Sequence, residues 1–203
     1  MYSVIYELLF SNFKSTSNVY ITYKEVKRAT WDVQRDLYMS GFWYEDTRLN
    51  RATVHWTMLP SKDTTGVFYH GTRWPDRIAS FREGHIFIPS ITLSKLLQPR
   101  IRVSLRDVIR HEYGHAFAHY YPELIIRSKE FRRVFSGHYY AEKPTKIYDS
   151  ASYVSSYAQS CPMEDFAETF MVYVRRHGKP LKNMNERLEA KWDFVRLLAS
   201  SCI

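Results

Sequence analysis

The stretch Arg110-His111-Glu112-Tyr113-Gly114-His115 contains the pattern H-E-x-x-H, inside an apolar run from Val103 to Ala118 whose spacing predicts an α-helix. Positions i and i+4 lie on one face of a helix, so His111 and His115 can present two imidazole nitrogens to one ion. That is half of a tetrahedral zinc site. Glu112 projects beside the metal, where a carboxylate can take a proton from water. The pattern also fits an ordinary amphipathic helix with satisfied histidines, and a third ligand decides between the two interpretations.

A candidate third ligand lies in the segment from Tyr157 to Phe170, which reads Y-A-Q-S-C-P-M-E-D-F-A-E-T-F. Pro162 suits the first turn of a helix, and the acidic residues after it suit the positive N-terminal end. Glu164 and Glu168 then share one face of this second helix. One can bind zinc while the other, one turn deeper, accepts a hydrogen bond from a ligand histidine and fixes its tautomer.

Together, H-E-Y-G-H and Y-x6-E-D-F-A-E-T-F resemble the gluzincin zinc metallopeptidases. Within them, the chain is similar to the group containing the catalytic domain of anthrax lethal factor and small bacterial metallopeptidases. The resemblance implies one zinc ion with the ligands His111, His115 and Glu164. It also implies that Glu112 is the general base, that Tyr157 stabilises the oxyanion and that Glu168 supports a ligand from behind. The match is detailed only in the second half of the chain, so the chemistry carries over and the substrate specificity does not.

The composition is that of a globular protein: 45% of the 203 residues are hydrophobic and 25% are charged. This length is enough for one good core. Length and composition therefore predict a single domain over residues 1–203, and the resemblance implies that it has a zincin-like α+β fold. An N-terminal helix and a small mixed sheet of three to four strands occupy residues 1–102, and the active-site and Glu helices occupy residues 103–203.

The first half of the chain shows one helical and three strand-like patterns. Thr22 to Glu25 forms a capping box, and apolar residues recur at helical spacing until Gly41. Period-two alternation or β-rich composition predicts strands at Thr53–Leu59, Gly66–His70 and His85–Pro89. In gluzincin-like folds the edge strand of such a sheet runs along the cleft and pairs with an extended substrate. We assign that edge to Ala79–Pro89.

The second half is predicted to be mainly helical. Capping and breaking residues divide it into a series of elements. The first is an active-site helix from a capping box at Ser104–Asp107 to about Tyr120, and a helix over Glu123–Phe135 follows it. A loop over Ser136–Ser156 then lines or covers the cleft. The last two elements are a Glu helix from Pro162 to about His177, capped by Gly178, and a final helix opening at Asn183–Glu186.

Other side chains near these elements have possible roles as metal ligands. They are His55, His70, His85, His119 and Cys161. Isolated histidines in strands are usually hydrogen-bonded core or surface residues, which we favour here. An extended H-E-x-x-H-x-x-G-x-x-H site is excluded because Ala118 and Tyr121 stand where it needs Gly and His. Cys161 is compatible with a thiolate ligand or inhibitory thiol, but we favour a helix N-cap or packing role.

Charge and hydropathy limit the partners. The formal charge is +8 and the pI is near 9.4, which favours acidic partners, yet the basic residues form no dense tract. The N-terminal residues lack the pattern of a signal peptide, and no apolar run has membrane-spanning length, so we expect a cytoplasmic protein as synthesised. Export by a dedicated apparatus fits equally well.

The sequence thus predicts a zinc-dependent endopeptidase that acts on a protein or peptide substrate. Two alternatives remain open at this point. The first is a protease that acts on proteins bound to DNA, which the positive charge would favour. The second is a non-catalytic interaction module stabilised by zinc, which would need four protein ligands.

Overall fold

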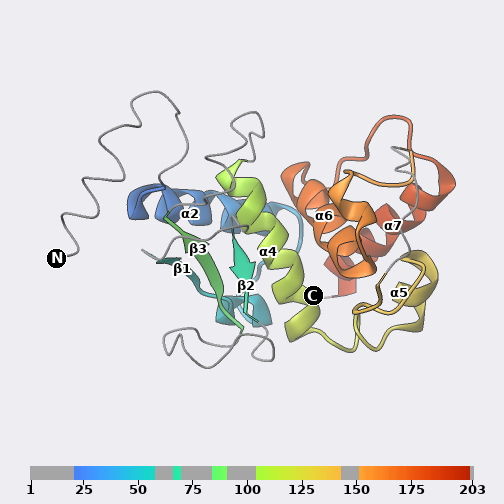
Figure 1. The fold of residues 1–203 in the computed structure, drawn as a ribbon, viewed down its shortest axis with the longest axis horizontal. Helices are drawn as coiled ribbons and strands as arrows, with labels where there is room; N and C mark the ends of the chain where they lie inside the picture. Colours follow the sequence, from blue (N-terminus) through green and yellow to red (C-terminus); the bar gives the residue numbers. More distant parts are fainter. Residues whose placement is uncertain (1–20, 58–65, 70–83, 91–103, 143–150, 202–203) are drawn as a thin grey trace.

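The computed structural model describes residues 21–57, 66–69, 84–90, 104–142 and 151–201 of the chain. Within these ranges it contains five α-helices, two short 3-10 helices and a three-stranded sheet, so the prediction of a mixed fold with a small sheet is confirmed (Figure 1). The elements are α2 (Tyr23–Met39), η1 (Arg48–Arg51), β1 (Val54–Thr57), β2 (Val67–Phe68), β3 (Ile86–Pro89), α4 (Leu105–Tyr120), α5 (Lys129–Val134), η2 (Tyr157–Gln159), α6 (Pro162–Arg175) and α7 (Glu186–Ser201).

Helix α2 begins at the predicted capping box. The Thr22 hydroxyl accepts a hydrogen bond from the Glu25 backbone N–H at 3.2 Å, and the Glu25 carboxylate accepts one from the Thr22 N–H at 2.8 Å. Because both N-terminal donors are satisfied, the helix starts sharply at this point. Its apolar stripe, which includes Val33 and Leu37, is fully buried. Gly41, with φ at 83°, turns the chain away just after the helix ends.

The three strands are in the order β1-β3-β2, with β1 parallel and β2 antiparallel to β3. Our assignment of Ala79–Pro89 as the edge strand was therefore wrong. Its described part, Ile86–Pro89, is the central strand of the described sheet and is buried along its whole length. The alternation of a strand locates it along the chain, but its neighbours are set by long-range pairing. Residues 79–83 lie outside the described part of the chain, as do the ends of the two other predicted strands.

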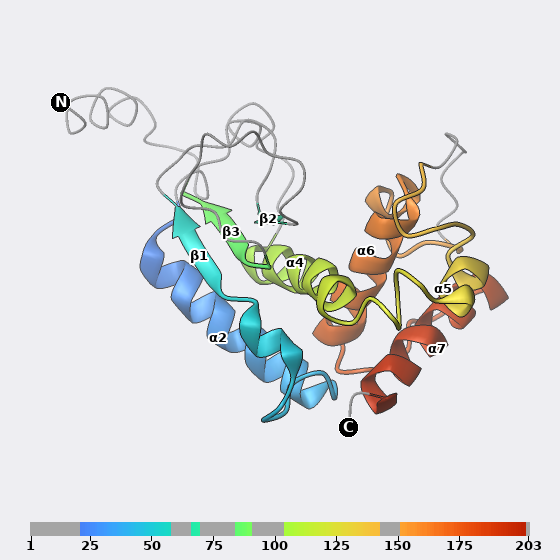
Figure 2. The same cartoon turned by 90° about the horizontal axis from the view of Figure 1, so that it is seen from below.

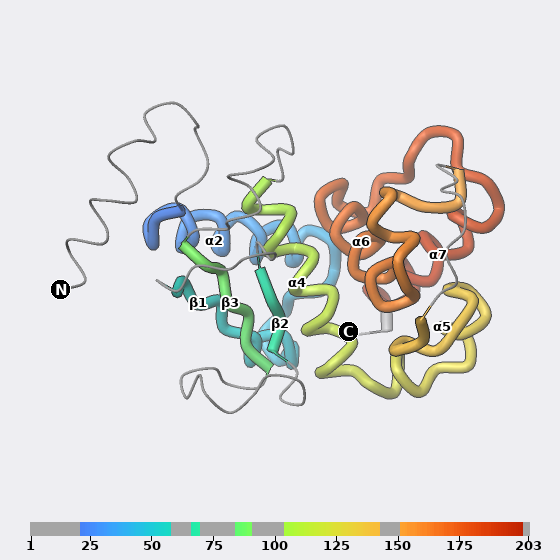
Figure 3. Tube along the Cα trace, in the orientation of Figure 1, coloured from blue at the N-terminus to red at the C-terminus, as the bar shows by residue number. Residues whose placement is uncertain are grey.

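Helix α4 lies in the middle of the molecule, between the α2 and sheet side and the helices α5, α6 and α7 (Figures 1 and 2). It contacts α2, β2 and β3 on one side and α6 on the other. The chain crosses from the first side to the second through α4 (Figure 3). Phe42 packs against Phe117 of α4 and Phe170 of α6, with ring centroids 5.4 and 4.7 Å apart, and joins the two sides into one core.

Two local predictions in the second half were wrong. Ser104 is the N-cap residue of α4, but its side chain makes no capping hydrogen bond. Asp107, the expected partner in a capping box, instead accepts hydrogen bonds from Arg110 at 2.6 Å and Arg175 at 3.1 Å, because ionic partners are stronger than a backbone N–H. The helix predicted over residues 123–135 is only the short α5, since the Ser128 hydroxyl caps a new helix there.

The last two helices follow the sequence closely. Pro162 occupies the first turn of α6, and Gly178, with φ at 75°, donates its N–H to the Tyr173 carbonyl just beyond the helix end. Asn185 caps α7 by accepting a hydrogen bond from the Leu188 N–H at 3.0 Å. The apolar stripe of α7 is buried: Leu188, Trp192, Val195 and Leu198. Among the described residues, no helix has the length and apolar character needed to cross a membrane.

Candidate metal centre

Helices α4 and α6 approach each other closely at a glycine inside the H-E-x-x-H pattern. A Cβ atom placed on Gly114 would lie 3.0 Å from the Cα atom of Ala167, which is tighter than most Cβ contacts in proteins and would push the backbone of Ala167 away. The glycine therefore allows the two helix backbones to touch. This contact brings the carboxylates on the first turns of α6 within reach of the histidines on α4.

Three predicted ligands converge at this contact. Nε2 of His111 lies 3.1 Å from Nε2 of His115 and 3.1 Å from Oε2 of Glu164. Nε2 of His115 lies 3.5 Å from the same Glu164 oxygen. Of the residues that the structure describes, these three are the ones grouped closely enough to hold a metal ion, with ligand atoms within 4.8 Å of one another.

The geometry of this group fits zinc. A tetrahedral ion with bonds of about 2.0–2.1 Å holds its ligand atoms about 3.3–3.4 Å apart, and the three observed separations lie on either side of that value. Oε2 of Glu164 is buried, and no described residue gives it a hydrogen bond of acceptable geometry. A buried carboxylate oxygen without a donor is unfavourable unless a cation binds it. Two imidazoles and one carboxylate are a donor set that zinc commonly uses at catalytic sites.

The other nitrogen of each histidine is held from behind. Nδ1 of His111 lies 2.8 Å from Oε1 of Glu168, and Nδ1 of His115 lies 3.0 Å from the hydroxyl of Tyr139, which is buried. When each Nδ1 carries the proton and donates it to its oxygen partner, each Nε2 presents a lone pair to the common point. The Glu168 carboxylate only accepts and therefore fixes this tautomer in His111, while the Tyr139 hydroxyl can accept from His115 in the same way.

The charges of the group also favour a bound cation. Burial lowers the pKa of His111, but its close contacts with the carboxylates of Glu164 and Glu168 outweigh it and raise this pKa to about 10. Burial would raise the pKa of Glu164, yet contacts with His111 and His115 hold it well below its usual range. In the metal-free protein a proton on His111 thus compensates these carboxylates. A zinc ion would take over that role.

Glu112 is buried beside the three ligand atoms but does not belong to their group. Burial raises the pKa of its carboxyl, while His111 and His115 act in the opposite direction. The backbone of Phe68 gives it a hydrogen bond, which links it to β2. A raised pKa makes this carboxyl hold a proton more readily, which is the property that a general base beside a metal position needs.

Tyr157 lies at the open side of the group, in η2. Its ring centroid is 5.9 Å from that of His111, and 54% of the residue is exposed. Burial of the hydroxyl and the nearby charges of Glu164 and Glu112 raise its pKa further above the usual value of a phenol. The hydroxyl therefore stays protonated at neutral pH and can donate a hydrogen bond.

The structure brings together all six predicted site residues, although their individual roles stay predictions. Of the other candidates, those that the structure describes do not belong to the metal group. His55 and His85 stack on each other with a nitrogen separation of 2.7 Å, and His119 packs edge-on against Phe68. Cys161 is a free thiol at the N-cap position of α6, as favoured, without a capping hydrogen bond from its side chain. His70 lies outside the described residues.

Three residues of the site were missed by the sequence analysis. Tyr139 and Ser155 come from the segment predicted to be a loop, and they contact His115 and Glu168, the latter at 2.6 Å. A loop has no periodicity from which such contacts can be read. Gly114 carried a usable signal, because a glycine inside a helix costs about 1 kcal/mol relative to alanine and commonly has a packing reason.

Comparison with known protein families matches residues 91–196 to the family described as "Putative zinc-binding metallo-peptidase". Searches of curated proteins and of solved structures each gave no match. The family match covers both helices that carry the metal group and spans just over half of the 203 residues. The chain therefore belongs to this family of zinc-binding metallopeptidases.

Proposed function

We propose that the protein is a zinc-dependent endopeptidase of the gluzincin type, in which His111, His115 and Glu164 hold one zinc ion. The observation that carries the proposal is the convergence of three ligand atoms from two helices at separations of 3.1 to 3.5 Å. One of the three is a buried carboxylate oxygen that lacks a hydrogen bond. The family match supports a metallopeptidase at a coarser level.

The residues around the metal position supply the acid and base of the reaction. A zinc ion bound there would act as a Lewis acid that polarises the scissile carbonyl and lowers the pKa of water. Glu112 takes a proton from the attacking water and delivers it to the leaving amine. Its burial, which raises its pKa, suits this double role. Glu168 keeps His111 oriented by accepting a hydrogen bond from its Nδ1–H group.

Tyr157 completes the mechanism as an oxyanion donor. Its hydroxyl is protonated and contacts the Glu164 side chain, and more than half of the residue is accessible to a substrate. In the proposed reaction, this hydroxyl donates a hydrogen bond to the negative charge that develops on the carbonyl oxygen. A donor aimed at that charge stabilises the transition state more than the bound substrate.

The strand β2 is our candidate for the substrate-binding strand. It is an end strand of the described sheet, and Phe68 in this strand contacts Glu112. An extended peptide lying along β2 would pass directly over the proposed base. Main-chain hydrogen bonds would then hold the peptide, and side-chain pockets would set the cleavage preference.

A purely structural zinc site is less consistent with this arrangement. Structural sites normally have four protein ligands, whereas the described residues supply a group of three. A catalytic site keeps the fourth position open for water or substrate. The placement of Glu112 and Tyr157 around the group also has a use only in catalysis.

The experiment compares the wild type with Glu112→Gln. Zinc content is measured by elemental analysis, and turnover by mass spectrometry of a peptide library. We expect one zinc per chain in both proteins and a loss of turnover of about 10²–10⁴-fold in the variant. Glu123→Gln is the matched control, because this carboxylate is exposed, pairs with Arg48 and has no part in the proposed reaction. Full turnover in Glu112→Gln would refute the assignment of the base, and a wild type without zinc or cleavage would refute the function.

A further inference from the structure

Lys191 of α7 is a fully buried lysine with partners from two other parts of the chain. Its ammonium group lies 2.8 Å from Oδ2 of Asp165, donates to the Ser152 carbonyl at 2.7 Å and sits 3.9 Å from the centre of the Tyr153 ring. Lysine is almost never fully buried unless it is paired, because removing the charge from water is strongly unfavourable. These partners define what Lys191 holds together: helix α6 and the start of the segment 152–157.

A second residue of α7 holds the same segment. The side-chain amide of Asn185 donates a hydrogen bond to the Ser152 hydroxyl at 2.8 Å, while its oxygen caps α7. Ser152 is buried and is therefore bound through its carbonyl by Lys191 and through its hydroxyl by Asn185. Two independent contacts on one residue fix the direction in which the chain leaves it.

The segment then reaches the metal group within a few residues. The Ser155 hydroxyl donates to Oε2 of Glu168 at 2.6 Å and accepts from the Ala158 N–H at 3.1 Å. The other oxygen of Glu168 holds Nδ1 of His111. Tyr157 follows two residues after Ser155. Three residues span at most about 10–11 Å, so the position of Ser152 limits where Ser155 can lie.

We propose that α7 forms part of the active-site support, with Lys191 and Asn185 as positioning residues. They hold the segment 152–157 so that Ser155 orients Glu168 and Tyr157 faces the metal position. This inference rests on the proposed function, because it assigns the segment a role in binding zinc and in stabilising the oxyanion.

The test uses the double variant Lys191→Met with Asp165→Asn, which removes both buried charges together and leaves neither unpaired. Leu198→Ala is the control, since Leu198 is a buried residue of the same helix and its truncation destabilises α7 by a cavity. Zinc affinity is measured by competition with a chromophoric chelator, ligand geometry by the absorption spectrum of the cobalt-substituted protein, and kcat and KM with a fluorogenic peptide cleaved by the wild type.

We expect the double variant to bind zinc about tenfold more weakly and to have a changed cobalt spectrum. A tenfold loss is the lower end of the effect seen when a residue that supports a metal ligand is removed. Its kcat should fall more than its KM rises, because Tyr157 acts in the transition state. Leu198→Ala should lower Tm and leave zinc affinity and the cobalt spectrum unchanged. Equal zinc affinities and spectra in the two variants would overturn the inference.

Asn185→Ser covers the case in which the double variant does not fold. Serine keeps an oxygen that can cap α7 but is too short to reach Ser152. A reduced zinc affinity in this variant supports the inference, and wild-type affinity overturns it. A wild type that binds no zinc would instead overturn the proposed function, so the two failures are distinguishable.

Discussion

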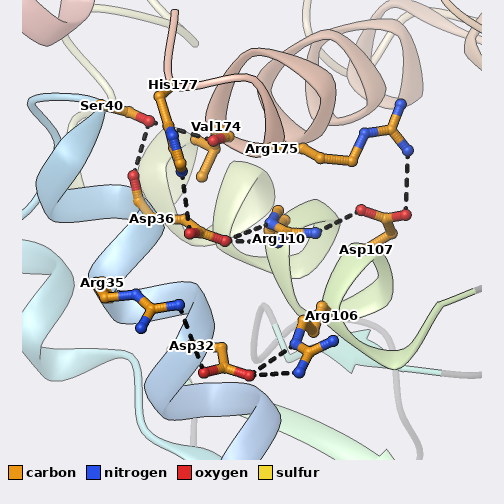
Figure 4. Close-up of polar contacts among 10 residues, drawn as sticks. All are labelled: Asp32, Arg35, Asp36, Ser40, Arg106, Asp107, Arg110, Val174, Arg175 and His177. Carbon is orange, nitrogen blue, oxygen red and sulfur yellow. Dashed lines mark hydrogen bonds and ion pairs between the residues drawn. The ribbon is translucent and has the colours of Figure 1, made fainter.

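Helix α4 carries two clusters of charged side chains, and they differ in how completely their charges are matched. In the first, Arg110 lies between two carboxylates, 2.5 Å from Asp36 of α2 and 2.6 Å from Asp107 (Figure 4). Arg175 and His177, from the end of α6 and just beyond it, bind the remaining oxygens of Asp107 and Asp36, each at 3.1 Å. Each of these carboxylate oxygens therefore has a nitrogen partner.

The metal group, which also joins α4 to α6, is not matched in this way. Its carboxylate, Glu164, and the two beside it, Glu112 and Glu168, face two imidazoles, and no lysine or arginine in the described ranges forms an ion pair with them. Oε2 of Glu164 lacks a hydrogen bond. The comparison teaches that residue type alone does not separate a structural cluster from a binding site. A closed set of partners indicates structure, and an open set of converging atoms indicates a ligand.

The largest effect should come from removing a member of the open set. Glu164→Gln replaces the carboxylate with an amide of the same shape. Structural sites bind zinc with a free energy of about 10–16 kcal/mol, which is about 3 kcal/mol for each of four ligands. Losing one ligand should therefore lower the zinc affinity more than about 100-fold. The metal-free variant should be less stable than the wild type, because the ionised Glu164 carboxylate, whose pKa is lowered in the fold, loses its contacts with His111 and His115. Chelator competition and thermal unfolding in EDTA measure the two quantities. A variant that keeps its affinity would place the ion elsewhere.

The matching change in the closed set is Asp36→Asn. Removing one partner of a buried ion pair destabilises proteins by about 3–5 kcal/mol, and we expect about 3 kcal/mol because Arg110 keeps Asp107. Zinc affinity of the folded variant should not change. Urea unfolding gives the free energy of unfolding, and the same chelator assay gives the affinity. If the affinity fell as far as in Glu164→Gln, the two clusters would not be independent.

A smaller effect is expected where α4 and α6 touch. Gly114→Ala should gain about 1 kcal/mol of helix propensity and lose about 1–3 kcal/mol through overpacking against Ala167, a net loss of about 1 kcal/mol. Because α6 must move away, zinc affinity should also fall. Thermal unfolding and zinc titration test both. Unchanged affinity would show that the carboxylates of α6 reach the histidines without this close contact.

The sequence predicted the parts of the site that depend on helical spacing. His111, His115, Glu164 and Glu168 could be placed because residues four apart share a helix face whatever surrounds the helix. The pairing of the two helices was inferred from the resemblance. Tyr139 was not predicted, because its contact with His115 depends on how an aperiodic segment folds back onto α4.

The errors have a common physical cause. The central position of β3 follows from which strands pair with it, and Asp107 binds two arginines because α4, α2 and α6 come together there. The strand order and the contact of Asp107 with Arg175 are decided by tertiary contacts that local propensity does not contain, whereas Arg110 lies only three residues from Asp107 in the same helix. The closed cluster around Arg110 was missed for the same reason, since its members come from three separate elements (Figure 4).

The smallest expected effect is the acid dependence of the closed cluster. Burial raises the pKa of Asp36, but Arg110 and His177 outweigh it, and the pKa is lowered overall. The folded-state pKa therefore lies below the unfolded value of about 4, so the ionised carboxylate stabilises the fold above that pH. This stabilisation is lost as the pH falls through the folded-state pKa. The difference in Tm between wild type and Asp36→Asn, measured in EDTA from pH 7 to pH 3, should accordingly be constant above about pH 5 and shrink below about pH 4. A difference that grew towards low pH would mean that Asp36 is protonated more readily in the folded protein, and the cluster would then not be closed.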